Sequence, residues 1–347
     1  MRRLLFAFLA LAPLSVTLHY VADLGATTEF VLAALALVPL AWLIGEATDH
    51  AAEHTGPGIG GFLNATFGNA PELIIALLAI NEGLTEVVRG SLTGSVIGNL
   101  LLVLGFSLAF GGRGELDRLS SFVSFGLIGV AVVVFFVTSA VGWSGDPDRD
   151  GLAALAVPLS IVLLVVYVGA TWFSLRRHHE LHVAGDEELA DAWPLPRALG
   201  VLAVATVATA FVAEVLVGSL EEFADKMGLT DFFVAAVIVA IVGNAAEHGG
   251  AVLVAYRGKI TLAAEIALAS AAQVAVFLIP AVALLSWLID PLALSFRVVE
   301  ITVLAGSLAL TIAVLWDGHS SRARGVLLVA GYAAVVVAFF AAGDRTF

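Results

Sequence analysis

Long apolar stretches separated by short polar segments dominate the pattern of this 347-residue chain. A helix needs about 20 mostly apolar residues to cross a bilayer, and eleven stretches of the chain meet this requirement. The pattern therefore predicts an all-α polytopic membrane protein with about eleven transmembrane helices. The ninth stretch is longer than one crossing requires, so we expect it to be tilted or broken. The predicted spans are 3–22, 28–49, 60–81, 86–110, 119–141, 152–175, 197–222, 231–255, 259–289, 295–316 and 323–342.

Composition agrees with a chain whose main partner is the lipid bilayer. The chain is 60% hydrophobic and only 13% charged, whereas soluble domains are about 45–50% apolar and about 25% charged. Cysteine is absent, which excludes disulfides and thiolate metal sites. The formal net charge of −13 argues against a nucleic-acid partner, which would need a basic surface. We expect no cofactor, and the oligomeric state stays open.

The basic residues of the loops predict the orientation of the chain. Arg2 and Arg3 precede the first apolar run, as they would in a signal peptide, but no small-residue cleavage pattern follows closely. We therefore expect an uncleaved first helix in a prokaryotic inner or plasma membrane. With a cytoplasmic N-terminus and an external C-terminus, eleven basic residues lie inside and five outside, as the positive-inside rule requires. The five external ones are Arg89, Arg149, Lys226, Arg297 and Arg345.

One motif occurs twice inside apolar segments. Gly68-Asn69-Ala70-Pro71-Glu72 is repeated as Gly243-Asn244-Ala245-Ala246-Glu247, 175 residues further on. A carboxylate at membrane depth costs at least about 2.5–3.5 kcal/mol, so it usually marks a functional site. Two carboxylates in matching positions predict one site that is built from two halves.

The repeated motif divides the chain into a first helix and two halves. We expect a first helix in 1–27, a first repeat in 28–175, an acidic cytoplasmic linker in 176–196 and a second repeat in 197–347. Each repeat has five spans, so the second copy enters the membrane from the opposite side. Such 1 + (5+5) inverted repeats are typical of secondary transporters, which bind their substrate near the midplane. The linker is either a solvated connector or a regulatory, cation-attracting element.

The first copy of the motif predicts an oxygen-rich cation site. Thr66, Asn69 and Glu72 are spaced three residues apart, so they would share one face of a helix. Pro71 cannot donate to the carbonyl four residues back, that of Phe67, and we expect freed carbonyls near Glu72. Carboxylate, amide and carbonyl oxygens are the ligands of Ca²⁺, and Mn²⁺ accepts similar ones.

In the second copy, Asn244 and Glu247 keep the spacing, the proline is lost, and His248 follows the glutamate. His248 is either a proton relay, because histidine titrates near neutrality, or a histidine bonded within the bundle. The helix after each motif is rich in small residues, as close helix packing requires. Its polar side chains either complete the site or form ordinary hydrogen bonds between helices. They are Ser95 and Asn99 in the first copy and Ser270 and Gln273 in the second.

Other polar residues within the spans have simpler explanations. We expect Glu46, Glu214, Glu265 and Glu300 to be paired or interfacial, with Glu265 the best further candidate because it shares a helix with Ser270. The cluster Asp49, His50, Glu53 and His54 could bind a metal but lacks the spacing of a zinc site with a third partner. The histidines of the linker, His178, His179 and His182, are expected to be solvated.

These motifs resemble the signatures of the calcium/cation–proton exchanger family. The run 65–75 followed by 91–95 is similar to the first signature, and Gly243-Asn244-Ala245-Ala246-Glu247-His248 with Gln273 and Pro280 is similar to the second. The resemblance covers nearly the whole chain, including the spans, the repeat and the acidic segment between halves. One departure is the run 268–273, which reads LASAAQ where the family commonly has a Gly-Ser-Ser-like sequence.

The resemblance implies a function and a set of site residues. Members of the family export Ca²⁺, or in some cases Mn²⁺, in exchange for protons. Glu72 and Glu247 would be the shared ion and proton site, and Asn69 and Asn244 would be the amide ligands. Sodium-coupled Ca²⁺ exchange is the nearest alternative. A passive cation channel and an intramembrane metalloenzyme built on Asp49 are alternatives from other classes, and an enzymatic role is not expected.

Overall fold

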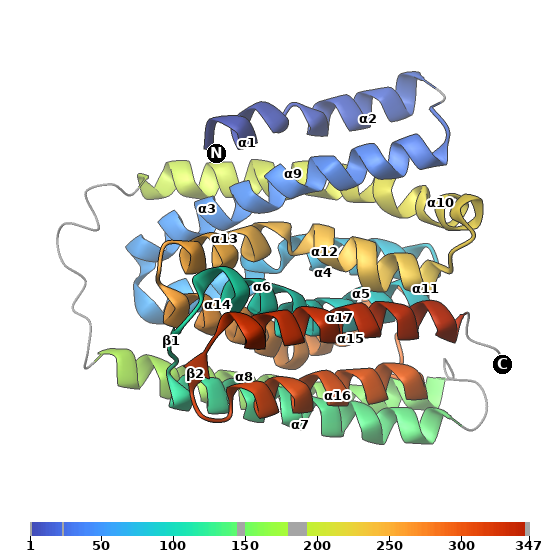
Figure 1. The fold of residues 1–347 in the computed structure, drawn as a ribbon. Coiled ribbons are helices and arrows are strands. Elements are labelled where there is room, and N and C mark those ends of the chain that lie inside the picture. The colour runs from blue at the N-terminus through green and yellow to red at the C-terminus, as the bar shows by residue number, and fades with distance from the viewer. Residues whose placement is uncertain (1, 23, 144–149, 180–192, 344–347) are drawn as a thin grey trace.

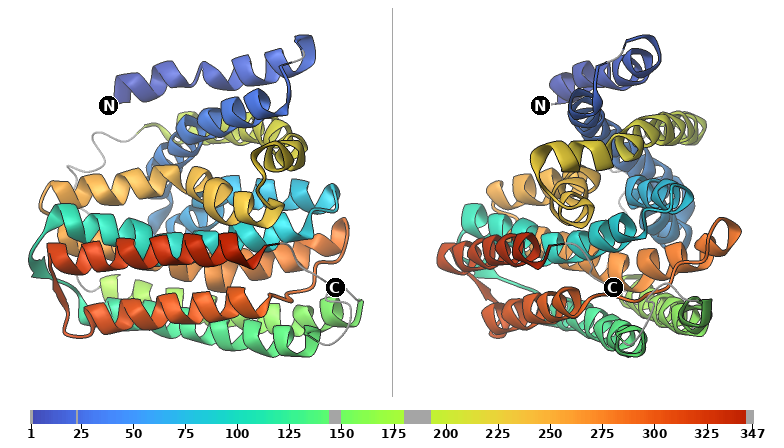
Figure 2. Two further views of the ribbon diagram at one scale, coloured as in Figure 1. Left: turned by 45° about the vertical axis from the view of Figure 1, so that its right-hand side comes forward. Right: turned by 90° about the vertical axis from the view of Figure 1, so that its right-hand side faces the viewer.

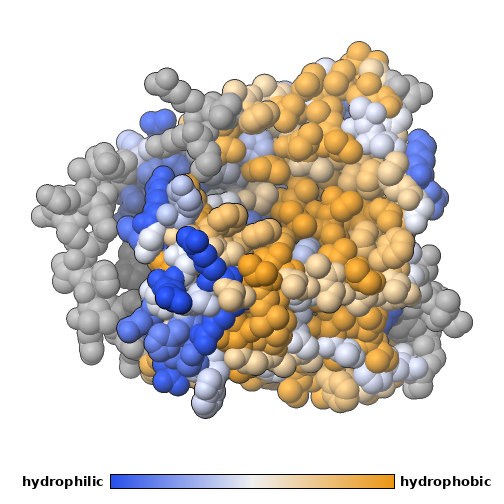
Figure 3. Space-filling view, in the orientation of Figure 1, coloured by the Kyte–Doolittle hydropathy of each residue, from blue (hydrophilic) through white to orange (hydrophobic). Residues whose placement is uncertain are grey.

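The computed structural model describes residues 2–22, 24–143, 150–179 and 193–343. Predictions for Arg149, His182, Arg345 and the acidic run 186–191 therefore lie outside the described residues. Long helices run side by side through the molecule (Figure 1), and an apolar band crosses its surface between two more polar ends (Figure 3). Among the described residues, eight helices are long and apolar enough to span a membrane, or ten if each of two bent pairs counts as one span. The protein is thus an all-helical membrane protein, as predicted.

The first half of the chain contains helices over each of the predicted ranges. A further strand pair and a π-helical segment were not predicted. The elements are α1 (Arg2–Phe8), α2 (Leu11–Val21), α3 (Ala26–Gly68), α4 (Ala70–Asn81), α5 (Thr85–Ile97), η1 (Gly98–Val103), α6 (Leu104–Gly111), β1 (Gly114–Glu115), α7 (Arg118–Gly142) and α8 (Asp150–His179).

The second half follows the same order with more interruptions. Its elements are α9 (Leu195–Gly218), α10 (Leu220–Met227), α11 (Asp231–Phe233), η3 (Val234–Val239), α12 (Ala240–Gly243), α13 (Ala245–Tyr256), α14 (Ile260–Gln273), η4 (Val274–Leu278), α15 (Ile279–Leu285), η5 (Ser286–Leu288), α16 (Val298–Leu315), β2 (His319–Ser320) and α17 (Arg322–Ala342). The helices α1 and α2 lie along one edge of the bundle, against α3 (Figure 2).

The long helix α3 corrects one prediction. The segment between the second and third predicted spans is helical rather than a loop, because α3 continues to Gly68. Residues eight apart in a straight helix are separated by about 12 Å. A Cβ atom on Gly60 would nevertheless lie 3.0 Å from the Cβ atom of Ala52. The helix therefore bends sharply between Thr55 and Gly60, and the chain turns back toward the interior.

The loops gather at two opposite ends of the bundle. At one end, Gly114 of β1 pairs with Ser320 of β2, and the Thr261 hydroxyl donates to the Glu115 carbonyl over 2.7 Å. At the other end, the Trp143 indole donates to the Phe296 carbonyl over 3.0 Å. These are the two groups of loops that the charge pattern assigns to opposite membrane faces. The assignment of each end to a side of the membrane stays a prediction.

Two of the cations predicted outside are buried in the structure. Arg89 is 1% exposed, and its guanidinium lies 2.7 Å from the Glu86 carboxylate. Arg297 lies 3.2 Å from Glu300, which confirms that Glu300 is a paired residue. These arginines hold helix ends together and present little charge to the water. The imbalance of basic residues between the two ends is therefore larger than the sequence count indicates.

The helix boundaries of the two halves follow the same register. A shift of 175 residues places the bounds of α4 on those of α13 and the start of α5 on the start of α14. Both α5 and α14 continue into a π-helical segment, η1 and η4. The span 259–289, which we expected to be tilted or broken, is not broken, because the helix runs on through η4 into α15. π-helical segments such as η1 and η4 are frequent at functional sites.

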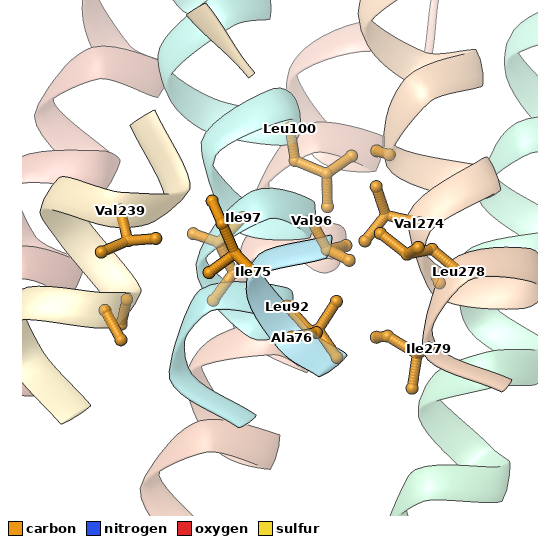
Figure 4. Packing of buried hydrophobic residues seen from close by; sticks show 14 of the residues in the cluster. Ile75, Ala76, Leu92, Val96, Ile97, Leu100, Val239, Val274, Leu278 and Ile279 are labelled. Carbon is orange, nitrogen blue, oxygen red and sulfur yellow. The ribbon is translucent and has the colours of Figure 1, made fainter. Parts of the chain in front are cut away.

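The hydrophobic core lies where the central helices of both halves meet. Ile75 of α4, Leu92 of α5 and Val274 of η4 pack together there (Figure 4), and each is at most 2% exposed. The small residues of α5, which the sequence predicted to favour close helix packing, make this contact close. A Cβ atom on Gly94 would lie only 2.0 Å from the carbonyl oxygen of Ala236 in η3. Glycine at this position lets two backbones approach directly.

Gly94 and Gly98 allow a matched pair of substitutions. We expect Gly94→Ala to lower the free energy of unfolding by about 1–3 kcal/mol, because the new methyl group overpacks the contact with η3. No described atom lies within 4 Å of a Cβ atom on Gly98, so Gly98→Ala should be neutral or stabilising. Thermal unfolding of both variants in detergent measures the difference. Equal midpoints for the two variants would contradict this packing.

Candidate functional site

An asparagine interrupts the helix in each copy of the repeated motif. Asn69 lies between α3 and α4 with φ −95° and ψ 13°, and Asn244 lies between α12 and α13 with φ −91° and ψ 7°. Around Asn69 the two helical segments meet at 50°. The second copy has the same break without a proline, so Pro71, in the first turn of α4, is not its cause. The prediction that Thr66 and Glu72 share one helix face is wrong, because the break separates them.

Each break places a glutamate in the first turn of the following helix. Glu72 is the third residue of α4, and Glu247 is the third residue of α13. The first turn of a helix has unpaired N–H groups and a partial positive charge, which favour a carboxylate. The fold therefore offsets part of the cost of charge at this depth.

The two motifs pack against each other reciprocally. A Cβ atom on Gly243 would lie 3.2 Å from Cγ and 3.3 Å from Cδ of Glu72. A Cβ atom on Gly68 would lie 3.5 Å from Oε1 of Glu247. Each glutamate thus lies over the glycine that begins the other motif. The structure brings residues 175 positions apart into one place.

In the site, the Asn244 amide and the Ser270 hydroxyl donate hydrogen bonds within the protein, and buried oxygen atoms remain available as acceptors. The Asn244 amide donates to Ser95 Oγ over 2.8 Å and to the Ala240 carbonyl over 3.0 Å. Its buried Oδ1 then has no hydrogen-bond partner among the described residues, and the same holds for Oε2 of Glu72. Ser270 donates from its hydroxyl to Oε2 of Glu247. A cation or a proton would satisfy these acceptors.

A cavity of about 510 Å³ leads to one of the two glutamates. Glu247, Ser270 and Gln273 line its inner part. Glu265, near the start of α14, lines it toward the end of the molecule that carries β1 and β2. Glu72 is 6% exposed and does not line the cavity. This cavity therefore reaches the site from the side of Glu247.

The predicted site residues differ in how closely they approach this arrangement. Ser95 and Ser270 contact the second motif directly, as described above, and Gln273 and Glu265 line the cavity. Asn99 donates to the Ser95 carbonyl over 3.1 Å, which is a bond within its own helix. Asn69 is buried, at 1% exposure. The prediction of these residues as ion ligands is not tested by the geometry alone.

Two predicted residues lie apart from the cavity. The Thr66 hydroxyl is buried and has no hydrogen-bond partner among the described residues. Nε2 of His248 is likewise buried with no described partner, and His248 is not among the lining residues. The predicted proton-relay role of His248 therefore stays a prediction.

Two acidic residues for which we expected other roles, as a paired or interfacial residue and as part of a possible metal cluster, belong to the cavity. Glu46 and Asp49 on α3 line it together with Glu247. Their spacing of three residues was visible in the sequence, but the face of α3 that points inward was not. The neighbouring histidines contact Trp193: the His50 ring stacks on its indole, and His54 Nε2 lies 2.7 Å from its carbonyl oxygen. His50 Nδ1 also lies 3.6 Å from the Glu53 carboxylate. Within the described part of the chain, no group of three His, Cys, Asp or Glu residues is arranged to hold a metal ion.

Comparison with known proteins places the chain in a family. The model of the family described as sodium/calcium exchanger protein matches residues 26–176 and 197–341. A Ca²⁺/H⁺ antiporter from Synechocystis sp. is 36% identical over 365 residues, which cover 97% of each chain. The Ca²⁺/H⁺ antiporter ChaA of Bacillus subtilis is 37% identical, over 90% of this chain and 91% of its own. A solved structure of native YfkE, 33% identical, superposes with a TM-score of 0.84 over 97% of this chain and 99% of its own.

The chain therefore belongs to the sodium/calcium exchanger family and, within it, to the calcium/cation–proton exchangers that its motifs resemble. The match extends over both halves of the chain and over nearly the full length of these relatives.

The bond between Ser95 and Asn244 generates a prediction for cation binding. Ser95→Ala would leave one buried amide N–H without its acceptor, at a cost of about 1–3 kcal/mol. We expect the affinity for a divalent cation, measured by calorimetry, to fall about tenfold, which corresponds to about 1.4 kcal/mol. The matched control is Ser91→Ala, since the Ser91 hydroxyl donates only to the Val88 carbonyl of its own helix. Equal affinities in the two variants would exclude Ser95 from the site.

Proposed function

We propose that this protein is a secondary antiporter that exchanges Ca²⁺ for protons by alternating access at a site shared by Glu72 and Glu247. The reciprocal packing of each glutamate on the glycine of the other motif is the observation that carries the proposal. It supports a single two-carboxylate site, as the duplicated motif predicts. The names of the relatives, which are Ca²⁺/H⁺ antiporters, support the pair of ions.

Electrostatics explains why such a site would exchange ions rather than leak. Two ionised carboxylates in a poorly solvated cavity repel each other, and burial disfavours their charge. One divalent cation neutralises the pair, and two protons do the same. The loaded states can therefore move between faces, whereas the empty, ionised state is held back. Charge balance alone would be met by two protons for each Ca²⁺.

The groups around the carboxylates suit a hard cation. Ca²⁺ binds six to eight oxygen atoms, which include carboxylates, amide carbonyls and waters. The carboxylates of Glu72 and Glu247 and Oδ1 of Asn244 would supply protein ligands, and the cavity would supply water. Asn69 is the expected counterpart of Asn244 in the first motif. Mn²⁺ accepts a similar set of ligands, so it stays a second candidate ion.

Alternating access follows from the two-part construction. The cavity opens from the end of β1 and β2, where the basic loops predict the cytoplasm. We therefore assign this conformation to the inward-facing side of the cycle, with the N-terminus in the cytoplasm and the C-terminus outside. The family match in two segments and the shared helix register support a first repeat in 28–175 and a second in 197–347. Two inverted repeats of this kind can move as rigid bodies against each other around a fixed binding site.

Sodium-coupled Ca²⁺ exchange is the nearest alternative, because the description of the family includes sodium. The curated relatives named above favour protons. A passive channel would conduct the cation without a counter-ion. A metalloenzyme centred on Asp49 is disfavoured by the names of the relatives, which are transporters, and by the contacts of His50 and His54 with Trp193.

Transport in everted membrane vesicles tests the proposal. We expect Ca²⁺ to dissipate an imposed pH gradient, and Glu72→Gln or Glu247→Gln to abolish this, because one fixed negative charge cannot balance a divalent ion. Glu82→Gln, an exposed residue just after α4, is the matched control and should transport normally.

The same vesicles separate the alternatives. Exchange driven by a sodium gradient without proton movement would support sodium coupling instead. Flux that does not saturate and needs no counter-ion would support a channel. Normal exchange in either glutamine variant would overturn the assignment of the site.

A further inference from the structure

A second cavity reaches the same helix from the other side. It has a volume of about 180 Å³ and lies among α7, α8 and α14. Ala269 and Gln273 line both this cavity and the larger one that contains Glu247. These two residues therefore lie between the two cavities. Gln273 follows Ser270, the donor to Glu247, by less than one helical turn.

The walls of the second cavity bear hydroxyl groups. Ser120 and Ser124 come from α7, and Tyr167 and Thr171 come from α8. Hydroxyl groups both donate and accept hydrogen bonds, so they can support a chain of water molecules. At about 30 Å³ for each molecule, the cavity would hold about six waters. The rest of the lining is largely apolar and includes Val123, Leu127 and Phe173, so the waters would follow the hydroxyl groups.

The second cavity starts at the same end of the molecule as the cation cavity. Asp117 lines it, and this residue caps α7 by accepting hydrogen bonds from the backbone of Leu119 and Ser120. The neighbouring Leu116 donates from its backbone to Gly318, which joins this region to the loop of β2. The cavity thus runs from the end predicted to be cytoplasmic toward the C-terminal end of α14.

We propose that the second cavity is a water-filled route for protons to Glu247, separate from the route of the cation. The inference rests on the proposed exchange of Ca²⁺ for protons. Beyond Asp117 at its mouth, the polar lining is neutral, and neutral hydroxyl groups cannot replace the carboxylates that a dehydrated Ca²⁺ requires. A proton from the water chain would pass Gln273 and form an O–H bond on the carboxylate of Glu247, and the reverse step breaks that bond.

Two routes have a mechanistic advantage. A cation that fills the larger cavity would block the exit of protons through the same space. With a second route, the protons displaced from the carboxylates can leave while the cation enters. Gln273, which lines both cavities, acts as a positioning residue at the junction.

A single introduced cysteine tests this route, because the chain has no cysteine of its own. Ser124→Cys keeps nearly the size of the original side chain, and bulk is added only after folding by a water-soluble aminoethyl methanethiosulfonate. The reaction needs the thiolate and therefore water at the site. Thr171→Cys tests the opposite wall. Val133→Cys, on the exposed surface near the middle of the same helix α7, is the matched control and should stay unmodified in the membrane.

Two transport modes are then compared in the same proteoliposomes. One is the exchange of Ca²⁺ for protons, and the other is the exchange of labelled Ca²⁺ for unlabelled Ca²⁺, which needs no proton. We expect modification of Ser124→Cys to slow the proton-coupled mode about tenfold or more, as losing a positioned proton relay does. Exchange of Ca²⁺ for Ca²⁺ should change by less than about twofold, a difference below about 0.4 kcal/mol.

Three outcomes would overturn the inference. The thiols at positions 124 and 171 could be as unreactive as that of Val133→Cys, which would indicate a lipid-filled groove. Modification could leave both modes unchanged, or it could slow both equally. If unmodified protein exchanged Ca²⁺ for Ca²⁺ but never for protons, the proposed function itself would fail, and the inference with it.

Discussion

The cost of placing two carboxylates inside an apolar bundle is the constraint on which the rest of this structure depends. One such group at membrane depth costs at least about 2.5–3.5 kcal/mol. The fold offsets part of this cost with the unpaired backbone N–H groups of a helix start. Each helix is broken at an asparagine, so that Glu72 and Glu247 lie in the first turn of a new helix. The glycine before each asparagine leaves room for the glutamate of the other half. The duplicated motif is therefore one interlocking unit.

The two halves of this unit are not equivalent in the observed conformation. Glu247 lines a cavity and accepts a hydrogen bond from Ser270, whereas Glu72 is buried behind it. This asymmetry is what a carrier needs when it exposes its site to one side of the membrane at a time. It also places Ser270 and Gln273 of α14 beside the accessible carboxylate, where ion and proton steps would begin.

Much of the architecture could be predicted because its signals are local or repeated. The apolar stretches predict helices where helices are found, and the offset of 175 between the two motifs predicts that Glu72 and Glu247 belong to one site. The sharp bend of α3 and the acids Glu46 and Asp49 could not be predicted in this way. Their positions depend on how α3 packs against α9 and α13, which are distant in sequence. From Pro71 we expected only freed carbonyls within one helix, whereas the helix is broken, and the same break at Asn244 shows that the asparagine is the shared element.

Counting the protons released when Ca²⁺ binds tests the central claim most directly. Calorimetric titration of the purified protein in buffers with different ionisation enthalpies gives this number. The account predicts that binding of one Ca²⁺ releases protons near neutral pH, and that Glu72→Gln and Glu247→Gln each reduce both the release and the affinity. Ca²⁺ binding of unchanged affinity in both variants, without proton release, would contradict a site shared by the two ions.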